Sequence, residues 1–207
     1  MKAADVDRFF EDFGRRVQRS IQITVTGGAA AILQGTSRAT YDIDFEIRIG
    51  KGDDWEFVQR AIDETATATG IAAQYAEDID QWSSIALPAK ESRLYRRFGK
   101  VEVRILNPAL WAIGKLARYL SSDVEDLRIV LKGAKTRPAA TVKLWGKALG
   151  ISPPSSSLGT FRKQVENFLD QYAQEIWGTA ADSAKLKRLF LASAQQSRAL
   201  RRTRGAP

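Results

Sequence analysis

The chain has 207 residues and a formal net charge of +8, and it contains neither histidine nor cysteine. This double absence excludes disulfides, thiol nucleophiles, zinc sites built from Cys and His, and catalysis by a Ser-His-Asp triad. Any metal site must use oxygen ligands, which favour hard cations such as Mg²⁺ or Mn²⁺. The apolar runs are shorter than the ~20 residues that span a bilayer, and the first residues lack the apolar segment of a signal peptide. We therefore expect a soluble, cytoplasmic protein with no membrane partner.

The first half of the chain alternates between helix and strand patterns. Apolar residues at three- and four-residue steps predict a helix from Val6 to Val17, and alternation predicts strands over 21–26 and 41–49. A glycine pair, Gly27-Gly28, separates the first strand from a short helix over 29–34. The elements expected next are a helix over 53–69, one or two strands within 71–92, and a β-hairpin of residues 93–98 and 101–106 joined at Gly99-Lys100.

From Pro108 onward the pattern is helical. The expected helices begin at Pro108, at Ser121 or Ser122, at Ala139, after the loop 151–157, and at about Asp182. This order predicts an α/β core over residues 1–107, followed by a helical C-terminal domain over 108–207 that ends in a basic tail.

The positive charge is unevenly distributed. Seven basic residues and no acidic residue follow Asp182, so the rest of the chain is nearly neutral. A second group of cations surrounds Glu102 in the expected hairpin: Lys90, Arg93, Arg96, Arg97, Lys100 and Arg104. Such asymmetry favours a polyanionic partner. The alternative for the tail is a solvated helix end with a frayed basic terminus.

Three features of the first domain point to the same chemistry. Gly27-Gly28 follows a strand and opens a helix, and a strand carrying Asp42 and Asp44 comes next. Carboxylates two residues apart on a strand share one face and lie about 7 Å apart along it. Glu102, on a third strand, supplies a further carboxylate. Converging carboxylates repel one another unless cations offset the repulsion, and two metal ions in such a site assist phosphoryl-type transfer.

These residues resemble a known family. A strand, a Gly-Gly turn, a short helix, Asp-x-Asp between apolar residues and a later acidic strand residue are similar to the signature of the DNA polymerase β-like nucleotidyltransferase superfamily. The stretch GGAAAILQGTSRATYDIDFEI resembles minimal bacterial nucleotidyltransferases, which include type IV toxin–antitoxin toxins. So do Lys115-x-x-Arg118 and Asp123-x-x-Asp126. The resemblance covers residues 22–132 and implies an α+β fold in which helices flank a mixed β-sheet.

The resemblance implies roles for individual residues. Asp42, Asp44 and Glu102 would bind Mg²⁺ or Mn²⁺, and Glu102 would position or deprotonate the acceptor hydroxyl. The nucleoside triphosphate would be bound by Gly27, Gly28, Arg38 and Lys115. Two departures weaken the match: Gly28 stands where many members have Ser, and Glu102 stands where they have Asp.

The implied activity is transfer of a nucleoside monophosphate from a triphosphate to a hydroxyl. The basic strands and tail favour an RNA acceptor such as the 3′ end of a tRNA, and as a toxin the protein would need an antitoxin partner. One alternative is a protein or small-molecule hydroxyl as acceptor. Another is an inactive nucleotidyltransferase-fold module that binds RNA or protein.

Several candidate residues also have a structural interpretation. Glu102 would then form a cross-strand ion pair with Arg96 or Arg97, and Arg38 would pair with the aspartates instead of with substrate. Arg118, Asp123 and Asp126 would form a salt-bridge network at a helical corner. The tertiary structure has to decide between these interpretations.

Overall fold

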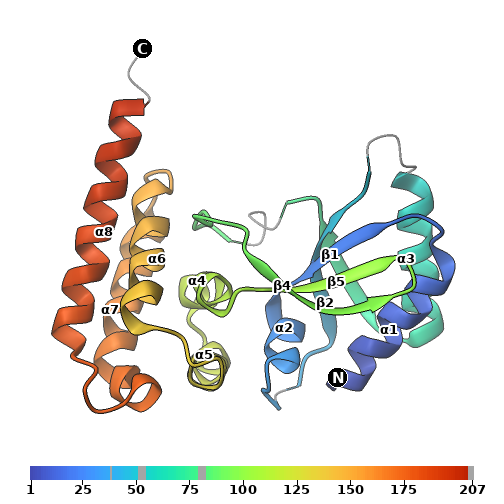
Figure 1. The fold of residues 1–207 in the computed structure, drawn as a ribbon, viewed down its shortest axis with the longest axis horizontal. Helices are drawn as coiled ribbons and strands as arrows, with labels where there is room; N and C mark the ends of the chain where they lie inside the picture. Colours follow the sequence, from blue (N-terminus) through green and yellow to red (C-terminus); the bar gives the residue numbers. More distant parts are fainter. Residues whose placement is uncertain (38, 51–54, 79–82, 205–207) are drawn as a thin grey trace. The chain divides into compact units, whose positions relative to one another are not determined.

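A computed structural model describes residues 1–37, 39–50, 55–78 and 83–204 of the chain. The described residues form five strands and eight helices (Figure 1). They divide into two compact units. The first contains Met1–Gln81 and Glu91–Asn107, and the second contains Trp82–Lys90 and Pro108–Pro207.

The first unit is built on one five-stranded sheet of order β3-β2-β1-β5-β4. β1 is antiparallel to β2 and parallel to β5, so the sheet is mixed, and the expected α+β class is confirmed. β4 and β5 form the expected hairpin, with a register shift between Leu94 and Arg96. The strands are β1 (Ile21–Val25), β2 (Asp42–Arg48), β3 (Ala72–Ala76), β4 (Ser92–Phe98) and β5 (Val101–Leu106).

One face of this sheet is apolar and carries the core of the unit. Helices α1 (Ala3–Arg16) and α3 (Trp55–Thr69) contact each other and bury their apolar stripes (Figure 1). The rings of Phe9 and Phe10 lie 6.4 Å and 5.8 Å from the ring of Phe45 on β2. Because strand residues alternate between faces, this packing leaves the other set of β2 side chains on the opposite face.

The opposite face is polar. The strand registers place on it the residues Gln22 and Thr24 of β1, Asp42, Asp44, Glu46 and Arg48 of β2, and Glu102 and Arg104 of β5. Both expected catalytic aspartates therefore lie on the same polar face of the sheet.

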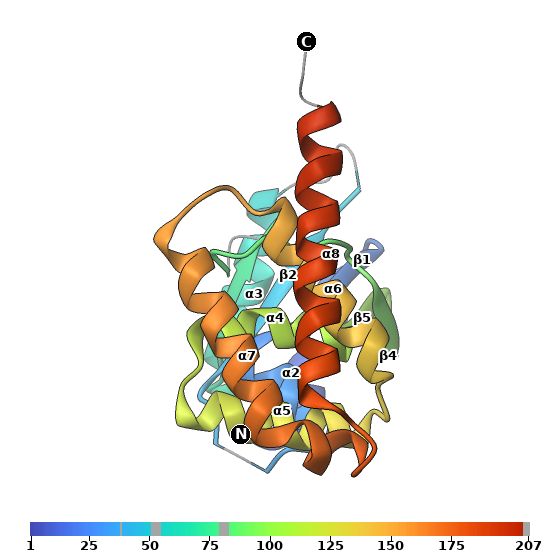
Figure 2. The ribbon, with the colours of Figure 1, turned by 90° about the vertical axis from the view of Figure 1, so that its left-hand side faces the viewer.

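The second unit contains five helices (Figure 2). Trp145 lies at its centre: the indole N–H donates to the carbonyl oxygen of Ala109 at 2.9 Å, and the rings of Phe168 and Trp177 lie 6.2 Å and 6.4 Å away. The helices are α4 (Pro108–Arg118), α5 (Ser121–Gly133), α6 (Pro138–Ile151), α7 (Ser156–Trp177) and α8 (Ser183–Arg204).

Helices α6 and α8 pack unusually closely, side by side in both ribbon views (Figures 1 and 2). A Cβ atom on Gly146 would lie 2.2 Å from the carbonyl oxygen of Phe190, and one on Gly150 would lie 2.5 Å from that of Ala194. The two glycines are four residues apart, so they form one smooth stripe on α6 along which the backbone of α8 lies.

Some boundaries differ from the expectation. The short helix α2 (Gly27–Leu33) begins at the glycine pair itself and not after it. In the described part of 71–92, β3 is the only strand apart from the first residue of β4. The chain passes between the units after Asn107, where the sequence analysis placed its boundary, but described residues 83–90 pack with the helical unit: Ile85 is fully buried, and the amide of Ala86 donates to Ser152 Oγ at 2.8 Å.

None of the helices in the described ranges has the length and apolar character that crossing a membrane requires.

Candidate active site

The candidate site lies where β1 ends and β2 begins. Because these strands are antiparallel neighbours, the end of one lies beside the start of the other. The amide of Thr26 donates to the carbonyl oxygen of Asp44 at 2.8 Å, so the ladder continues one step past β1. The glycine turn and the Asp-x-Asp strand, 14 and more residues apart in the chain, are thereby in direct contact.

Gly27 adopts a left-handed conformation (φ +61°), which glycine tolerates and other residues disfavour. A Cβ atom at this position would lie 1.9 Å from Asp44 Oδ2. The space that a side chain would fill is therefore occupied by the Asp44 carboxylate. The sequence pattern assigned this glycine to phosphate binding, whereas in the structure its smallness first serves to admit the carboxylate. Gly28 is buried as the second residue of α2.

Asp42 lies two residues before Asp44 on the same face of β2, and both residues are half-buried. The Asp42 carboxylate accepts hydrogen bonds from Gln74 Nε2 at 2.9 Å and from Thr40 Oγ1 at 3.4 Å. These neutral donors orient the carboxylate. The two aspartates are therefore positioned side by side, about 7 Å apart along the strand.

Gln74 is a site residue that the sequence does not reveal. It lies on β3, which pairs in parallel with β2 and places Gln74 opposite Asp44, one step from Asp42. The neighbouring alternation in AAQYA is too short to identify a pairing partner, so only the tertiary fold shows that this amide reaches Asp42.

Glu102 is not brought together with the two aspartates. It is level with Gln22 of β1, whereas Asp44 is level with Thr26. Four residues along the strands and two strand spacings across the sheet correspond to about 13 Å and about 10 Å. That separation is too large for one pair of metal ions ~3.5–4 Å apart to contact all three carboxylates.

The Glu102 carboxylate is instead held between two guanidinium groups. Arg104 Nη1 donates to Oε1 at 2.7 Å, and Arg97 Nη2 donates to Oε2 at 2.8 Å. Hydrogen bonds from Arg104 and then Arg97 lower the pKa of Glu102 below its ordinary value. A lowered pKa makes this carboxylate a weaker base, and the ion pair with Arg97 is the structural alternative that the sequence analysis left open.

Lys115 is buried within the helical unit, with a side chain that is 3% exposed. Its ammonium group donates to Asp123 Oδ1 at 3.0 Å and to Asp126 Oδ2 at 2.8 Å. Arg118 also donates to Asp123, through Nε at 2.8 Å and Nη2 at 2.7 Å. Arg118, Asp123 and Asp126 thus belong to a salt-bridge network at the corner between α4 and α5, as their structural interpretation had it. Lys115, which the resemblance assigned to the nucleoside triphosphate, is a further member of this network.

Burial by itself raises the pKa of Asp123, but hydrogen bonds from Arg118 and the charges of Lys115 and Arg118 outweigh burial and lower the pKa. Asp123 Oδ2 also accepts from the amide of Leu120 at 3.2 Å, next to the first turn of α5. This carboxylate therefore serves the helix corner and the cations at once. The remaining expected nucleotide contact, Arg38, lies outside the described residues.

Within the described ranges, no three carboxylate side chains gather closely enough to form a metal cluster. Comparison of the chain with protein-family models, with curated proteins and with solved structures finds no match. The features that bear on function are therefore the positions of Gly27, Asp42 and Asp44 relative to one another.

Proposed function

We propose that this chain is a magnesium-dependent nucleotidyltransferase of the DNA polymerase β-like type, which transfers a nucleoside monophosphate from a triphosphate to a hydroxyl group of an RNA acceptor. One observation carries the proposal: the left-handed Gly27 lies against the Asp44 carboxylate, at the junction of adjacent strands. If the glycine turn and the Asp-x-Asp strand had separate roles, the fold would not require them to be in contact.

Asp42 and Asp44 fit a divalent cation. They are two half-buried oxygen donors on one face of a strand, and neutral donors orient Asp42. Mg²⁺ at phosphoryl-transfer sites is commonly held by one or two carboxylates together with substrate phosphates, so two aspartates suffice. When bound, the cation would offset the negative charge that develops on the phosphate oxygens.

In the proposed reaction, the acceptor oxygen forms a bond to the α-phosphorus and loses its proton to solvent water, and the bond from that phosphorus to the bridging oxygen breaks to release pyrophosphate. Asp42 and Asp44 would hold the cation that supplies this charge stabilisation, and Gln74 keeps Asp42 in place. We assign no proton transfer to Glu102, because its carboxylate is distant and already engaged by two arginines. Acting on a tRNA 3′ end in the cytoplasm, such an enzyme would block translation and require an antitoxin partner.

The test is incubation of the protein with each α-labelled nucleoside triphosphate, Mg²⁺ and total RNA. We expect label in RNA, and a loss of at least about 100-fold in the Asp42→Asn/Asp44→Asn variant, since several kcal/mol of charge stabilisation are removed. Asp63→Asn, which removes an exposed carboxylate from α3, is the matched control. Absence of label from RNA, or equal labelling by the double variant, contradicts the proposal; label in protein or in a small molecule supports the other acceptors.

A second candidate is favoured by one observation. Two side chains that the family pattern assigns to the site, Glu102 to catalysis and Lys115 to nucleotide binding, are neutralised by ion pairs within the fold. This is what an inactive module that binds RNA would show. Calorimetry separates the two functions: an enzyme binds triphosphate only with Mg²⁺ and through Asp42 and Asp44, whereas the module binds RNA in a salt-dependent way without such nucleotide binding.

A further inference from the structure

A hollow of about 540 Å³ lies on the first unit, at the end of the sheet opposite to the Gly27 turn. Its polar lining comes from four strands and the segments that join them: Ser20, Gln22, Arg48, Arg97, Lys100 and Glu102. Those of the described residues that line it include no aromatic side chain, so the hollow offers charge and hydrogen bonds and no surface for stacking a base.

Four of these residues form one straight row across the sheet. Arg97 is paired with Glu102, Glu102 with Gln22, and Gln22 with Arg48. Three strand spacings make this row about 14 Å long. It carries one arginine at each end, with the Glu102 carboxylate and the Gln22 amide between them, and the Arg97 and Arg48 side chains are 67% and 49% exposed.

The row has an excess of positive charge. Glu102 is shared by Arg97 and Arg104, and Glu46 pairs with Arg48. The Lys100 ammonium donates to the carbonyl oxygen of Gln18 at 2.5 Å, which does not neutralise it. Together the row and its neighbours contain four cations (Arg48, Arg97, Lys100 and Arg104) and two carboxylates (Glu46 and Glu102), which leaves a local charge of +2.

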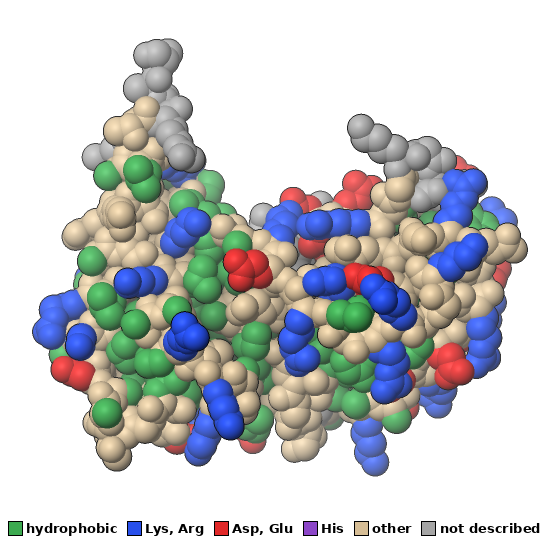
Figure 3. All heavy atoms as spheres, in the orientation of Figure 1, with side chains coloured by type: hydrophobic (Ala, Val, Ile, Leu, Met, Phe, Trp, Pro, Cys, Tyr) green, Lys and Arg blue, Asp and Glu red, His purple; other side chains and the backbone are tan. Residues whose placement is uncertain are grey.

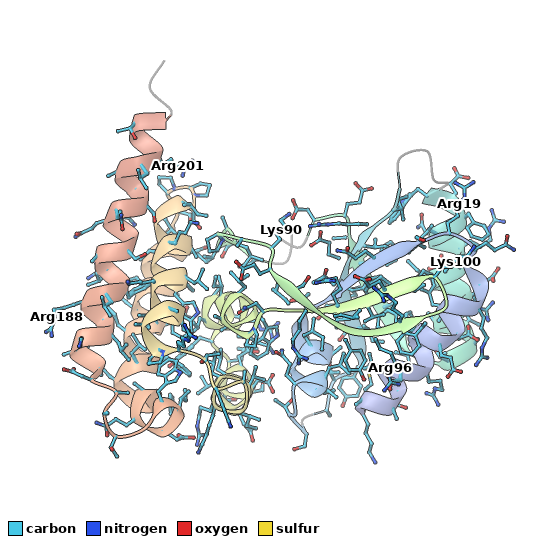
Figure 4. The ribbon with its side chains drawn as sticks, in the orientation of Figure 1. Arg19, Lys90, Arg96, Lys100, Arg188 and Arg201 are labelled. Carbon is cyan, nitrogen blue, oxygen red and sulfur yellow. The ribbon has the colours of Figure 1, made fainter. Side chains whose placement is uncertain are left out.

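Lys100 is fixed at the tip of the hairpin (Figure 4). Its carbonyl oxygen accepts from the amide of Ile21 at 3.1 Å, and a Cβ atom on the adjacent Gly99 would lie 3.1 Å from the carbonyl oxygen of Gly14. The backbone that carries the third cation is thus held between β1 and α1, so the positive charge is built into the sheet and does not belong to a loose side loop.

Basic residues also protect edge strands from aggregation, and β4 is an edge strand of this sheet. That explanation covers the Lys and Arg side chains gathered over the hairpin in Figure 3, but not Arg48, which lies on the interior strand β2. Arg48 pairs with the buried Glu46, but about half of its side chain stays exposed, so it also extends the positive charge from the edge of the sheet to an interior strand.

From these observations we infer that Arg97, Gln22 and Arg48 of the row, together with Lys100, bind the sugar-phosphate backbone of RNA. Its length exceeds a single phosphate, and its amide and the Ser20 hydroxyl suit sugar hydroxyls, including the 2′-OH that distinguishes RNA. Without aromatic platforms, binding is expected to depend little on base sequence. Glu102 acts as the positioning residue that holds Arg97 and Arg104.

The inference deepens the proposed function, on which its link to an acceptor rests. Arg48 lies four residues from Asp44 on the same face of β2, about 13 Å along the strand. The row runs across the strands, so RNA bound along it would have to turn at Arg48 and follow β2 for about 13 Å to present a hydroxyl group at Asp44.

The test measures binding of a fluorescently labelled, mixed-sequence single-stranded RNA to the full-length protein at several salt concentrations. The Arg97→Gln/Lys100→Gln variant should bind at least about 10-fold more weakly, with a salt slope smaller by about 1.4, because two phosphate contacts are lost. Arg48→Gln, at the other end of the row, should also weaken binding, which an edge-protection role would not produce.

The matched control is Arg93→Gln/Arg96→Gln. It removes the same charge from the same hairpin, but Arg93 and Arg96 are paired with Ile105 and Val103, so they lie on the opposite face, where Arg96 contacts Asp7 of α1 (Figure 4). We expect this variant to bind RNA as the wild type does. Equal loss in both double variants, or no RNA binding by the wild-type protein, overturns the inference.

The Asp42→Asn/Asp44→Asn variant separates this inference from the proposed function. If it binds RNA normally and transfers no label, both stand. If RNA binds through the row while the wild-type protein transfers no nucleotide, the proposed function fails and the surface remains. If nucleotide is transferred to another acceptor and RNA does not bind, only the surface is contradicted.

Discussion

Gly27 shows how a single residue can be required by a neighbour that is distant in sequence. Its left-handed φ alone would favour glycine, and because Asp44 Oδ2 lies 1.9 Å from where a Cβ atom would be, any other residue would also have to displace that carboxylate. Gly70 has a similar φ of +69° and nothing within 4 Å of the corresponding Cβ position. Substituting each glycine in turn therefore distinguishes the cost of backbone strain from the cost of a clash with the candidate site.

We predict that Gly70→Ala costs about 1–2 kcal/mol of stability through the left-handed conformation alone. Gly27→Ala should cost about 1–3 kcal/mol more, since the methyl group overpacks the site, and it should also abolish nucleotidyl transfer by displacing the Asp44 carboxylate. Urea unfolding and the labelling assay measure the two effects. Equal stability losses in the two variants would show that the Asp44 contact is unimportant.

The lowered pKa of Asp123 leads to a second prediction at the residue scale. Its pKa is lowered in the folded protein, mainly because cationic partners outweigh burial. A lowered pKa contributes stability that is present above the unfolded value of about 3.9 and is lost as pH falls through the folded pKa.

The Asp123→Asn variant should therefore be less stable than the wild type at pH 7, by about 3–5 kcal/mol for a broken buried ion pair. The difference should shrink as the pH falls below about 4. Urea unfolding of both proteins between pH 7 and pH 3 measures it, and Glu125→Gln, which removes an exposed carboxylate from the same helix, is the control. A stability difference that stays constant down to pH 3 would contradict the prediction.

At the scale of the elements, the close packing of α6 and α8 depends on small residues. Gly146 and Gly150 face the carbonyl oxygens of Phe190 and Ala194, and Ser193 Oγ donates to the carbonyl oxygen of Lys143 at 2.9 Å. Arg201 Nη1 donates to the carbonyl oxygen of Ile151 at 2.9 Å, which satisfies an unpaired acceptor at the end of α6. One residue of the basic tail therefore has a structural use.

Gly146→Ala is expected to destabilise the helical unit by about 1–3 kcal/mol, because the helices must move apart to admit the methyl group. Gly159→Ala on α7 is the control: its Cβ position is open, so the substitution should stabilise the helix by up to about 1 kcal/mol. Thermal unfolding followed by circular dichroism measures both. Stabilisation by Gly146→Ala would mean that α6 and α8 do not pack in this way.

For the molecule as a whole, the two compact units do not follow one cut in the chain. Described residues 83–90 lie between β3 and β4 in sequence but belong to the helical unit, where Ile85 is fully buried. A substitution in the first half of the chain should therefore affect the second unit.

Ile85→Ala is predicted to cost about 2–5 kcal/mol, as for other large-to-small changes in a core. Hydrogen exchange measured by mass spectrometry should show faster exchange in α6, near Ser152, and unchanged exchange in β1 and β5. Faster exchange confined to the sheet would show that residues 83–90 belong to the first unit and would contradict the prediction.

The sequence by itself determined most of the elements and the two motifs that carry the proposal. Hydrophobic periodicity is a local property, so it located β1, β2, the β-hairpin and the helices of the second unit to within a few residues, whereas for β3 it gave only one or two strands somewhere within 71–92. The spacing of residue types along the sequence also identified Gly27, Asp42 and Asp44, because one strand-turn-helix-strand segment brings them together.

The strand order and register decided the rest, because they depend on which distant segments pair and not on local pattern. They placed Gln74 beside Asp42, separated Glu102 from the aspartates, and aligned Glu102 with Gln22 and Arg48 in a positive row. Likewise, the sequence showed that Lys115 and Asp123 share a motif, but only the packing of α4 on α5 showed that burial commits their charges to each other.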